Sequence, residues 1–263
     1  MTQRPLEPVT FESDTMSEKT IVAMWSGPRN ISTAMMRAFE NRPDTAVWDE
    51  PFYAHYLDTT GSDHPMRDAV IDAGETDAET VIARCLDVPN APNRQGNNPD
   101  IWFQKHMTVH MQPGIRLDWT AESRNFFLIR KPESVLASYH DRRANPTPDD
   151  VGYARQVELF DLMTRQQGTE PPVIDSDAVL ANPEGSMRAL CAALSIPFDP
   201  SMLSWPTGTR ADDGVWAAHW YASVDTSSGF SPPRAPRPLP EHLRAIAETC
   251  RPHYEKLAKR ALV

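Results

Sequence analysis

The segment TIVAMWSGPRNISTAMMRAFEN, residues 20–41, decides the fold predicted for this chain. Residues 21–25 are an apolar run of strand length, and residues 26–30 then carry turn-forming side chains. From Ile31 onward, apolar residues recur at helical spacing. The segment therefore predicts a buried strand, a short loop and a helix whose first turn points its free N–H groups above the end of the strand.

An anion is expected at this helix start. The N-terminus of a helix is the positive end of its dipole, Ser32 and Thr33 add hydroxyl groups, and Arg29 adds a permanent cation. The loop lacks the second glycine and the lysine of the P-loop signature G-x-x-x-x-G-K-[ST]. It also lacks the G-x-G-x-x-G of dinucleotide-binding folds, because Gly27 is its one glycine.

The loop resembles the 5′-phosphosulfate-binding loop of sulfotransferases that use 3′-phosphoadenosine 5′-phosphosulfate (PAPS), written x-P-[KR]-S-G-[ST]-T. Four residues fit this pattern: Pro28, Arg29, Ser32 and Thr33. Asn30 and Ile31 stand where the family has Ser-Gly. The resemblance implies that all six residues, 28–33, bind PAPS. The alternative is an ordinary capped helix after a strand.

A second strand, turn and helix are expected over residues 125–139, NFFLIRKPESVLASY, with Pro132 at the first helical position. This segment resembles the 3′-phosphate motif of the same family, which has a strand-end arginine, a nearby proline and a serine farther along the helix. The resemblance implies that Arg130 and Ser138 bind the 3′-phosphate, and arginine can bind phosphate oxygens bidentately. The alternative is an arginine paired with a neighbouring carboxylate.

Residues 173–198 resemble a third, structural segment of the family, with Pro183 and an apolar stripe at the expected places. Three resemblances in the same order across residues 20–230 identify the chain as sulfotransferase-like. They imply an α/β fold: a three-layer, P-loop-type parallel sheet with helices on both faces and long irregular lid or substrate loops. We expect a flexible N-terminal tail over residues 1–19 and one sulfotransferase-like domain over residues 20–263.

Alternating periodicities along the chain predict the same architecture. Strands are expected at 20–25, 45–48, 101–105, 125–129 and 172–175. Helices are expected at 31–41, 78–85, 132–143, 150–167, 183–195 and 240–261. Such alternation is typical of a parallel sheet that binds ligands at the C-terminal ends of its strands.

The resemblance implies a transfer of a sulfuryl group from PAPS to an acceptor molecule, and this transfer needs a base that takes a proton from the acceptor. Two residues are candidates for the base. His106 follows the strand at 101–105, near the place where many sulfotransferases have K-x-H, although here Lys105 and His106 are adjacent. Glu50-Pro51 matches the E-P that some bacterial relatives carry after the second strand. We prefer His106 because an imidazole has a suitable pKa without perturbation, whereas Glu50 needs burial to raise its pKa.

The proposed transfer needs preorganised positive charge rather than a metal ion. Arg29 is expected to stabilise the sulfuryl group in the transition state, with Lys105 in support. His106 and His110 are four residues apart, but no H-E-x-x-H motif or cysteine pair accompanies them. We therefore expect no metal site.

The stretch at 207–230 is rich in aromatic residues and interrupted by glycine. It loosely resembles the late R-K-G-x-x-G-x-W-K loop of the family, with Arg210, Gly214 and Trp216 at the matching positions. The resemblance implies that Arg210 binds the nucleotide and that the stretch closes over it. An aromatic plug that seals the core is the alternative.

Composition narrows the classes of function and location. The formal net charge of −10 argues against a general nucleic-acid or membrane-surface binder. The three widely spaced cysteines indicate a reducing, cytoplasmic compartment. No apolar run is long enough to span a bilayer, and residues 1–20 are too polar for a signal peptide.

The leading hypothesis is sulfuryl transfer from PAPS to a hydroxyl or amine of a small-molecule acceptor, which leaves adenosine 3′,5′-bisphosphate (PAP). A P-loop nucleotide kinase or phosphotransferase is one alternative, and a catalytically silent nucleotide-binding protein is another. A pyridoxal-phosphate enzyme is a weaker candidate, because no lysine stands in a context typical of a Schiff base. The sequence identifies neither the acceptor nor the oligomeric state.

Overall fold

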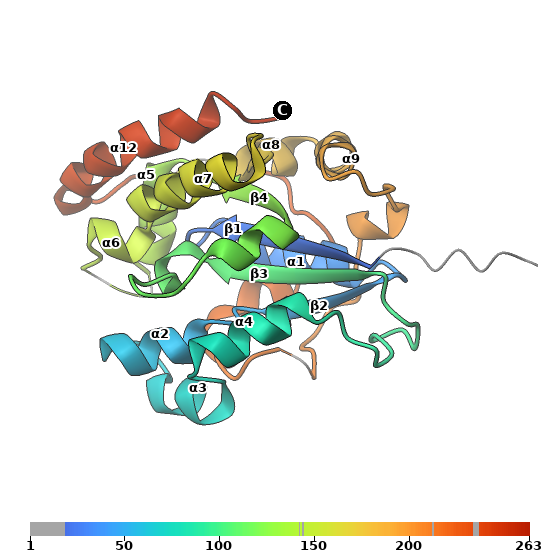
Figure 1. The fold of residues 1–263 in the computed structure, drawn as a ribbon. Coiled ribbons are helices and arrows are strands. Elements are labelled where there is room, and N and C mark those ends of the chain that lie inside the picture. Colours follow the sequence, from blue (N-terminus) through green and yellow to red (C-terminus); the bar gives the residue numbers. More distant parts are fainter. Residues whose placement is uncertain (1–18, 142, 144, 212, 234–236) are drawn as a thin grey trace, which may run out of the picture.

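The computed structural model describes residues 19–263 except 142, 144, 212 and 234–236 (Figure 1). The tail predicted over residues 1–19 lies outside the described residues apart from Lys19. In the described part, five strands form one parallel sheet in the order β2-β3-β1-β4-β5. The strands are β1 Thr20–Ser26, β2 Thr45–Asp49, β3 Ile101–Met107, β4 Arg124–Ile129 and β5 Val173–Asp175.

The central position of β1 determines where a ligand can bind. The chain first builds the side of the sheet that contains β2 and β3, and then the side that contains β4 and β5. Ser26, at the end of β1, is level with Met107 on β3 and Leu128 on β4. Ligands of open parallel sheets bind at the strand ends where the strand order reverses, which here is the edge above β1.

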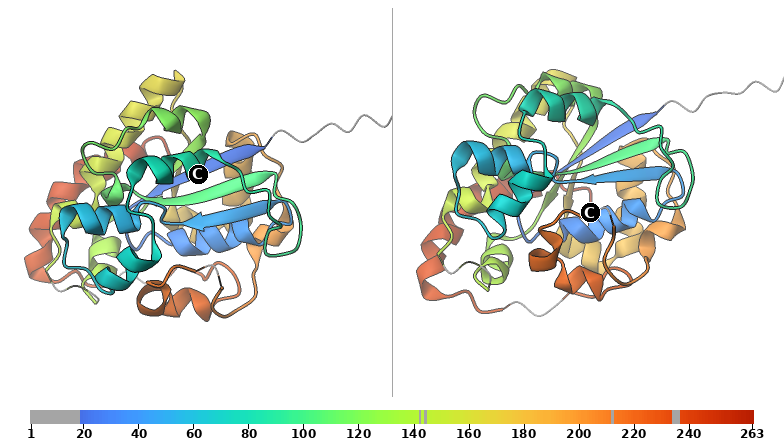
Figure 2. Two further views of the ribbon diagram at one scale, coloured as in Figure 1. Left: turned by 60° about the horizontal axis from the view of Figure 1, so that its bottom comes forward. Right: turned by 90° about the horizontal axis from the view of Figure 1, so that it is seen from below.

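Helices cover both faces of the sheet (Figures 1 and 2). On one face, α1 (Ser32–Glu40) and α9 (Pro183–Ala193) pack against alternate strand residues, including Met24 and Phe126. On the other face, the intervening strand residues, such as Trp25, meet three further helices. These are α4 Ala78–Leu86, α7 Tyr153–Gln167 and α12 Arg244–Ala258. The three-layer architecture predicted from the sequence is therefore confirmed.

The connections hold helices that sequence periodicity did not indicate. A third apolar cluster joins α2 (Tyr53–Thr60) and α3 (Arg67–Ala73) to the segment that carries α10 (Ala217–Trp220) and α11 (Ala222–Asp225). This segment lies beside α1 in Figure 2. A further additional helix is α8 Ser176–Ala181. Short 3₁₀ turns are η1 Thr108–His110, η2 Asp118–Glu122, η3 Pro200–Leu203 and η4 Glu241–Leu243. None of the described helices is long and apolar enough to cross a membrane.

The helix expected at 150–167 is two helices, because Gly152 adopts a left-handed conformation at φ +68° between them. α6 (Pro148–Val151) ends at this glycine, and α7 begins directly after it. A Cβ atom on Gly152 would lie 2.6 Å from Val109 Cγ1, so the turn sits close against η1. Two other expected helices are shorter than predicted, since α5 is Pro132–Tyr139 and α12 begins at Arg244.

We predict that Gly152→Ala destabilises the protein more than Gly168→Ala does. Both glycines have φ near +70°, so alanine at either position should cost about 1 kcal/mol of backbone strain. The Cβ at Gly168 meets nothing within 4 Å, whereas the one at Gly152 meets Val109. The free energy of unfolding of Gly152→Ala, measured by urea denaturation, should fall by about 1–3 kcal/mol more. Equal losses in the two variants would contradict the close packing.

Candidate active site

The loop between β1 and α1 has two residues in the left-handed region. Arg29 has φ 60° and Ile31 has φ 57°. The left-handed conformation costs an L-residue about 1–2 kcal/mol, and for a β-branched side chain it is a true outlier. Ile31 stands where the pattern of the resembled family has glycine, so this chain keeps the turn that glycine favours. As the N-cap of α1, Ile31 forms no side-chain capping bond, and the first-turn N–H groups have no side-chain cap.

Buried hydrogen bonds hold this loop from below. Asn30 donates from Nδ2 to the Leu128 carbonyl at 3.1 Å, and Ser176 Oγ donates to the Asn30 carbonyl at 2.9 Å. Gln156 of α7 donates to the carbonyls of Trp25 and Leu128. The bonds of Asn30 to β4 and from Ser176 therefore fix the loop, and Gln156 fixes the strand ends that flank it. Such preorganisation is what an anion site needs if its N–H groups are to converge on one point.

The two segments predicted to bind phosphate meet in the structure. Arg29 Nε donates to Ser138 Oγ at 3.0 Å, although the two residues are 109 positions apart. Arg130 Nη1 donates to the Arg29 carbonyl at 2.9 Å, and Tyr153 OH donates to the Arg130 carbonyl at 2.7 Å. The start of α1, the end of β4 and helix α5 thus form one cationic group at the carboxyl edge of the sheet.

A carboxylate lies beside this group. Asp177, at the start of α8, is 3.7 Å from Arg130 Nε and 3.7 Å from Lys131 Nζ. The Nε atom of Arg130 forms no hydrogen bond to any described residue. Arg130 thus has a loose ion pair as well as the bond to the Arg29 carbonyl.

A second polar group occupies the ends of β2 and β3. Lys105 is 1% exposed, and its Nζ donates to Asp49 Oδ1 at 2.7 Å, to Glu50 Oε1, and to Tyr221 OH at 3.2 Å. Tyr221 in turn donates to Asp49 Oδ2. Glu50, at φ 45°, is left-handed directly before Pro51. Strained backbone of this kind is common at functional sites.

Burial sets the electrostatics of this lysine group. Burial raises the pKa of Glu50, and the nearby Lys105 ammonium opposes this rise only in part. Burial alone would lower the pKa of Lys105, but the carboxylates of Asp49 and Glu50 raise it well above its usual value. One ammonium is therefore held between two carboxylates, and burial raises the pKa of Glu50, which strengthens its affinity for a proton.

His106 lies on the opposite face of β3 from Lys105, because successive strand side chains alternate. Its ring stacks on Trp25 with centroids 4.5 Å apart, and its Nε2 is 3.0 Å from Gln104 Oε1. Burial, with a smaller contribution from Lys105, lowers the pKa of His106 to about 3. The structure therefore does not bring His106 together with Glu50, and a neutral, stacked ring in the core is what its surroundings favour.

Arg210 also lies apart from the predicted phosphate segments. Its Nε is 3.3 Å from Glu40 Oε2 at the far end of α1, and its Nη atoms donate to nearby backbone carbonyls. Arg37, on the same helix, donates to both oxygens of Asp213 at 2.6 Å. These buried ion pairs tie the 207–225 stretch to α1. Arg210 thus anchors this stretch, and its guanidinium is already satisfied there.

Sequence reasoning missed the partners of Lys105 and Glu50. Asp49 and Tyr221 contact Lys105, and His110 Nε2 lies 3.9 Å from Glu50 Oε2. Because successive side chains of a strand point to opposite faces of the sheet, the sequence could have shown that Lys105 and His106 do not lie on the same side. No local signal indicates Tyr221, because it reaches the site from a segment 116 residues away.

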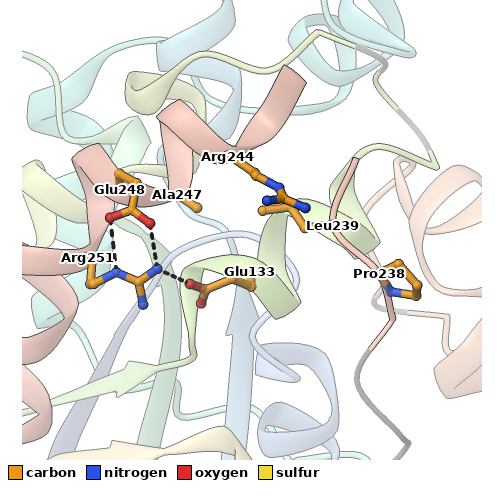
Figure 3. A pocket seen from close by; sticks show the side chains of 7 residues that line it. All are labelled: Glu133, Pro238, Leu239, Arg244, Ala247, Glu248 and Arg251. Carbon is orange, nitrogen blue, oxygen red and sulfur yellow. Dashed lines mark hydrogen bonds and ion pairs between the residues drawn. The ribbon is translucent and has the colours of Figure 1, made fainter. Parts of the chain in front are cut away.

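Two surface hollows lie outside these groups. One, of about 300 Å³, lies between α5 and α12, where Arg251 pairs with both Glu133 and Glu248 (Figure 3). The other, of about 330 Å³, is lined by parts of α2, the start of α4 and residues 112–115. Neither contains a residue of the two polar groups above. Within the described part of the chain, no cluster of three or more His, Cys, Asp or Glu side chains is arranged to hold a metal ion.

Two comparisons relate this chain to known proteins, one of sequences and one of solved structures. Branched-chain-amino-acid aminotransferase-like proteins 1 and 2 of Arabidopsis thaliana are 35% and 34% identical to it over 92% and 90% of its length. These alignments cover 42% and 41% of the relatives, so the chain spans about two fifths of their length. The solved sulfotransferase domain from the curacin biosynthetic pathway superposes with a TM-score of 0.48 at 17% identity, over 88% of this chain and 97% of that one.

One protein family accounts for almost the entire chain. This family is the sulfotransferase domain family, and its domain matches residues 19–261. The matched region begins just before β1 and ends beyond α12, so it contains both polar groups. The chain therefore belongs to the sulfotransferase domain family.

Proposed function

We propose that this protein transfers a sulfuryl group from PAPS to a hydroxyl or amine of a small-molecule acceptor. The observation that carries the proposal is the hydrogen bond from Arg29 to Ser138, which joins the two predicted phosphate segments. A nucleotide with phosphates at both its 5′ and 3′ positions needs two anion sites on one surface. Membership of the sulfotransferase family supports the same donor.

The two ends of the nucleotide are assigned to different parts of the cationic group. The 5′-phosphosulfate fits the start of α1, where the N–H groups have no side-chain cap and the helix dipole favours an anion. The 3′-phosphate fits Arg130 and Ser138, where Arg130 Nε has a hydrogen bond still to make. A kinase is disfavoured because the loop has no lysine in the P-loop position to reach a terminal phosphate.

In the proposed transfer, the acceptor displaces the nucleotide at sulfur in line. The acceptor O–H or N–H bond breaks, its electron pair forms a bond to sulfur, and the proton passes to a base. The bond from sulfur to the bridging oxygen breaks, and that electron pair leaves on the 5′-phosphate of PAP. Arg29, in the loop between β1 and α1, supplies fixed positive charge for the leaving oxygen and the sulfuryl oxygens.

We propose Glu50 rather than His106 as the base. Glu50 directly follows β2 at the carboxyl edge of the sheet, and 12% of its side chain is exposed. Burial raises the pKa of Glu50, which makes it a better proton acceptor. His106 faces the core, with its ring against Trp25. Lys105 keeps the Glu50 carboxylate in place through the bond to Oε1. Its ammonium has three donors, and each of them faces an oxygen of the same group.

Arg130→Ala should weaken binding of PAP far more than binding of adenosine 5′-phosphosulfate, which has no 3′-phosphate. A charge-assisted bond contributes about 1.5–3 kcal/mol, so the dissociation constant for PAP should rise by about tenfold to hundredfold. Calorimetric titration of both nucleotides measures the difference. Arg188→Ala is a suitable control, because Arg188 pairs with Glu184 on the exposed side of α9. Equal losses for the two nucleotides would rule out Arg130 as a 3′-phosphate ligand.

Glu50→Gln should slow the chemical step by about a hundredfold or more, with a much smaller effect on PAP affinity. The rate of the wild-type enzyme should rise with pH as Glu50 loses its proton, at a pH above the usual carboxyl range because burial raises its pKa. Single-turnover transfer from ³⁵S-labelled PAPS, with a panel of hydroxyl and amine acceptors, measures both effects.

His106→Phe is the matched comparison for that experiment, because phenylalanine keeps the stacked ring on Trp25. Its chemical step should stay close to wild type. If His106→Phe abolishes transfer and Glu50→Gln does not, the base is His106 and our assignment is reversed.

A further inference from the structure

A buried histidine, His110, lies close to Glu50. Neither the family resemblance nor the proposed transfer assigns it a role. His110, in η1, is 4% exposed. Its ring is sandwiched between two tyrosines of α2: Tyr53 at 4.6 Å with a 10° interplanar angle, and Tyr56 at 4.9 Å with 25°. The two rings fix the plane of the imidazole, so its nitrogens can point only within that plane.

The two nitrogens of His110 have different surroundings. Nε2 lies 3.9 Å from Glu50 Oε2, whereas Nδ1 is buried and forms no hydrogen bond to any described residue. The tautomer that carries its proton on Nε2 directs an N–H at the carboxylate and leaves only a lone pair unsatisfied. The other oxygen of Glu50, Oε1, accepts from Lys105. The carboxylate is thus flanked by Lys105 on one side and by His110 on the other.

The charges around His110 keep its ring neutral. The titratable groups facing it are Tyr53 and Tyr56 from α2, His64 from the segment after α2, Glu50 after β2, and Lys105 and His106 from β3. Burial has the largest effect and, with His64, Lys105 and His106, it lowers the pKa of His110 well below its usual value. A neutral imidazole donates one N–H and carries no charge, so it can orient a carboxylate without neutralising it.

We propose that His110 is a positioning residue for Glu50, whose Oε2 accepts a hydrogen bond from His110 Nε2–H in the working enzyme. Hydrogen bonds at catalytic groups are often long before substrate binds, and the gap of 3.9 Å closes with a small movement of the carboxylate. Each carboxylate oxygen has two lone pairs, so Glu50 can still take the acceptor proton while it is bonded to both neighbours. The catalytic meaning of this bond rests on the proposed function.

The proposal makes a prediction about Glu50 that requires no substrate. A hydrogen bond to the ionised carboxylate favours that form and holds the pKa of Glu50 down, so its removal should raise the pKa of Glu50. In protein labelled with ¹³C-glutamate, the carboxyl carbon of Glu50 is identified by its absence in Glu50→Gln, and its titration is followed by NMR. His110→Phe keeps an aromatic ring between the tyrosines but has no N–H, and it should raise the Glu50 pKa by about one unit.

Two further variants separate this bond from a general effect of mutation. His110→Gln keeps an N–H donor and should restore a Glu50 pKa close to that of wild type. His253→Phe, in α12, should leave it unchanged. A His110→Phe protein whose Glu50 titrates as in wild type overturns the proposal, and so does a rise that His110→Gln shares in full.

This titration is independent of the proposed transfer. If PAP fails to bind to the wild-type protein, the transfer proposal fails, but the Glu50 titration still decides the role of His110. If PAPS is turned over, the rising limb of the single-turnover rate should move to higher pH in His110→Phe by the same amount as the measured Glu50 pKa. A merely structural role for His110 would lower the rate at every pH without this displacement.

Discussion

The parallel sheet brings the residues proposed to bind the nucleotide and to act as the base to one edge. Parallel strands all end at the same side, and β1 lies between β3 and β4, so the loops after these strands converge whatever their distance in the sequence. The hydrogen bond between Arg29 and Ser138 is the direct result, since it joins the loop after β1 to the helix after β4. The same edge places Glu50, after β2, near the end of β3, where its N–H bonds the Lys105 carbonyl.

Buried charge explains why polar side chains surround Lys105 in the second polar group of the candidate site. An ammonium that is 1% exposed is strongly unfavourable unless carboxylates surround it, and Lys105 contacts Asp49 and Glu50. Tyr221, from a distant segment, also belongs to this group, since its hydroxyl accepts from Lys105 and donates to Asp49. The pairs of Arg37 with Asp213 and of Arg210 with Glu40 have the same character and attach that segment to α1. The 207–230 stretch thus both seals an apolar cluster and supplies Tyr221 to the polar group.

The sequence was sufficient for the positions of the strands, because strand periodicity and turn residues are local, and it indicated that both predicted phosphate segments follow strands of one parallel sheet. Each of the five predicted strands overlaps an observed one, and α1 begins within one residue of its expected start. Side-chain partners are different, since they depend on the order of the strands and on connections that carry no periodicity. Adjacency made Lys105 and His106 look like a functional pair, yet strand alternation separates them onto opposite faces. Arg210 fits a motif by spacing, but Glu40 holds it at the far end of α1.

One nucleotide is proposed to span both predicted anion sites. The most direct test compares the thermal stabilisation of the protein by PAP, by adenosine 5′-monophosphate and by adenosine 3′-monophosphate at equal concentrations, with ATP and Mg²⁺ as a fourth ligand. A ligand at one hundred times its dissociation constant adds about 2.7 kcal/mol to the free energy of unfolding, so affinity differences appear directly as stability differences. PAP should stabilise the protein more than any of the other three. Stabilisation by ATP with Mg²⁺ that equals or exceeds that by PAP, or no advantage of PAP over the two monophosphates, would contradict the account.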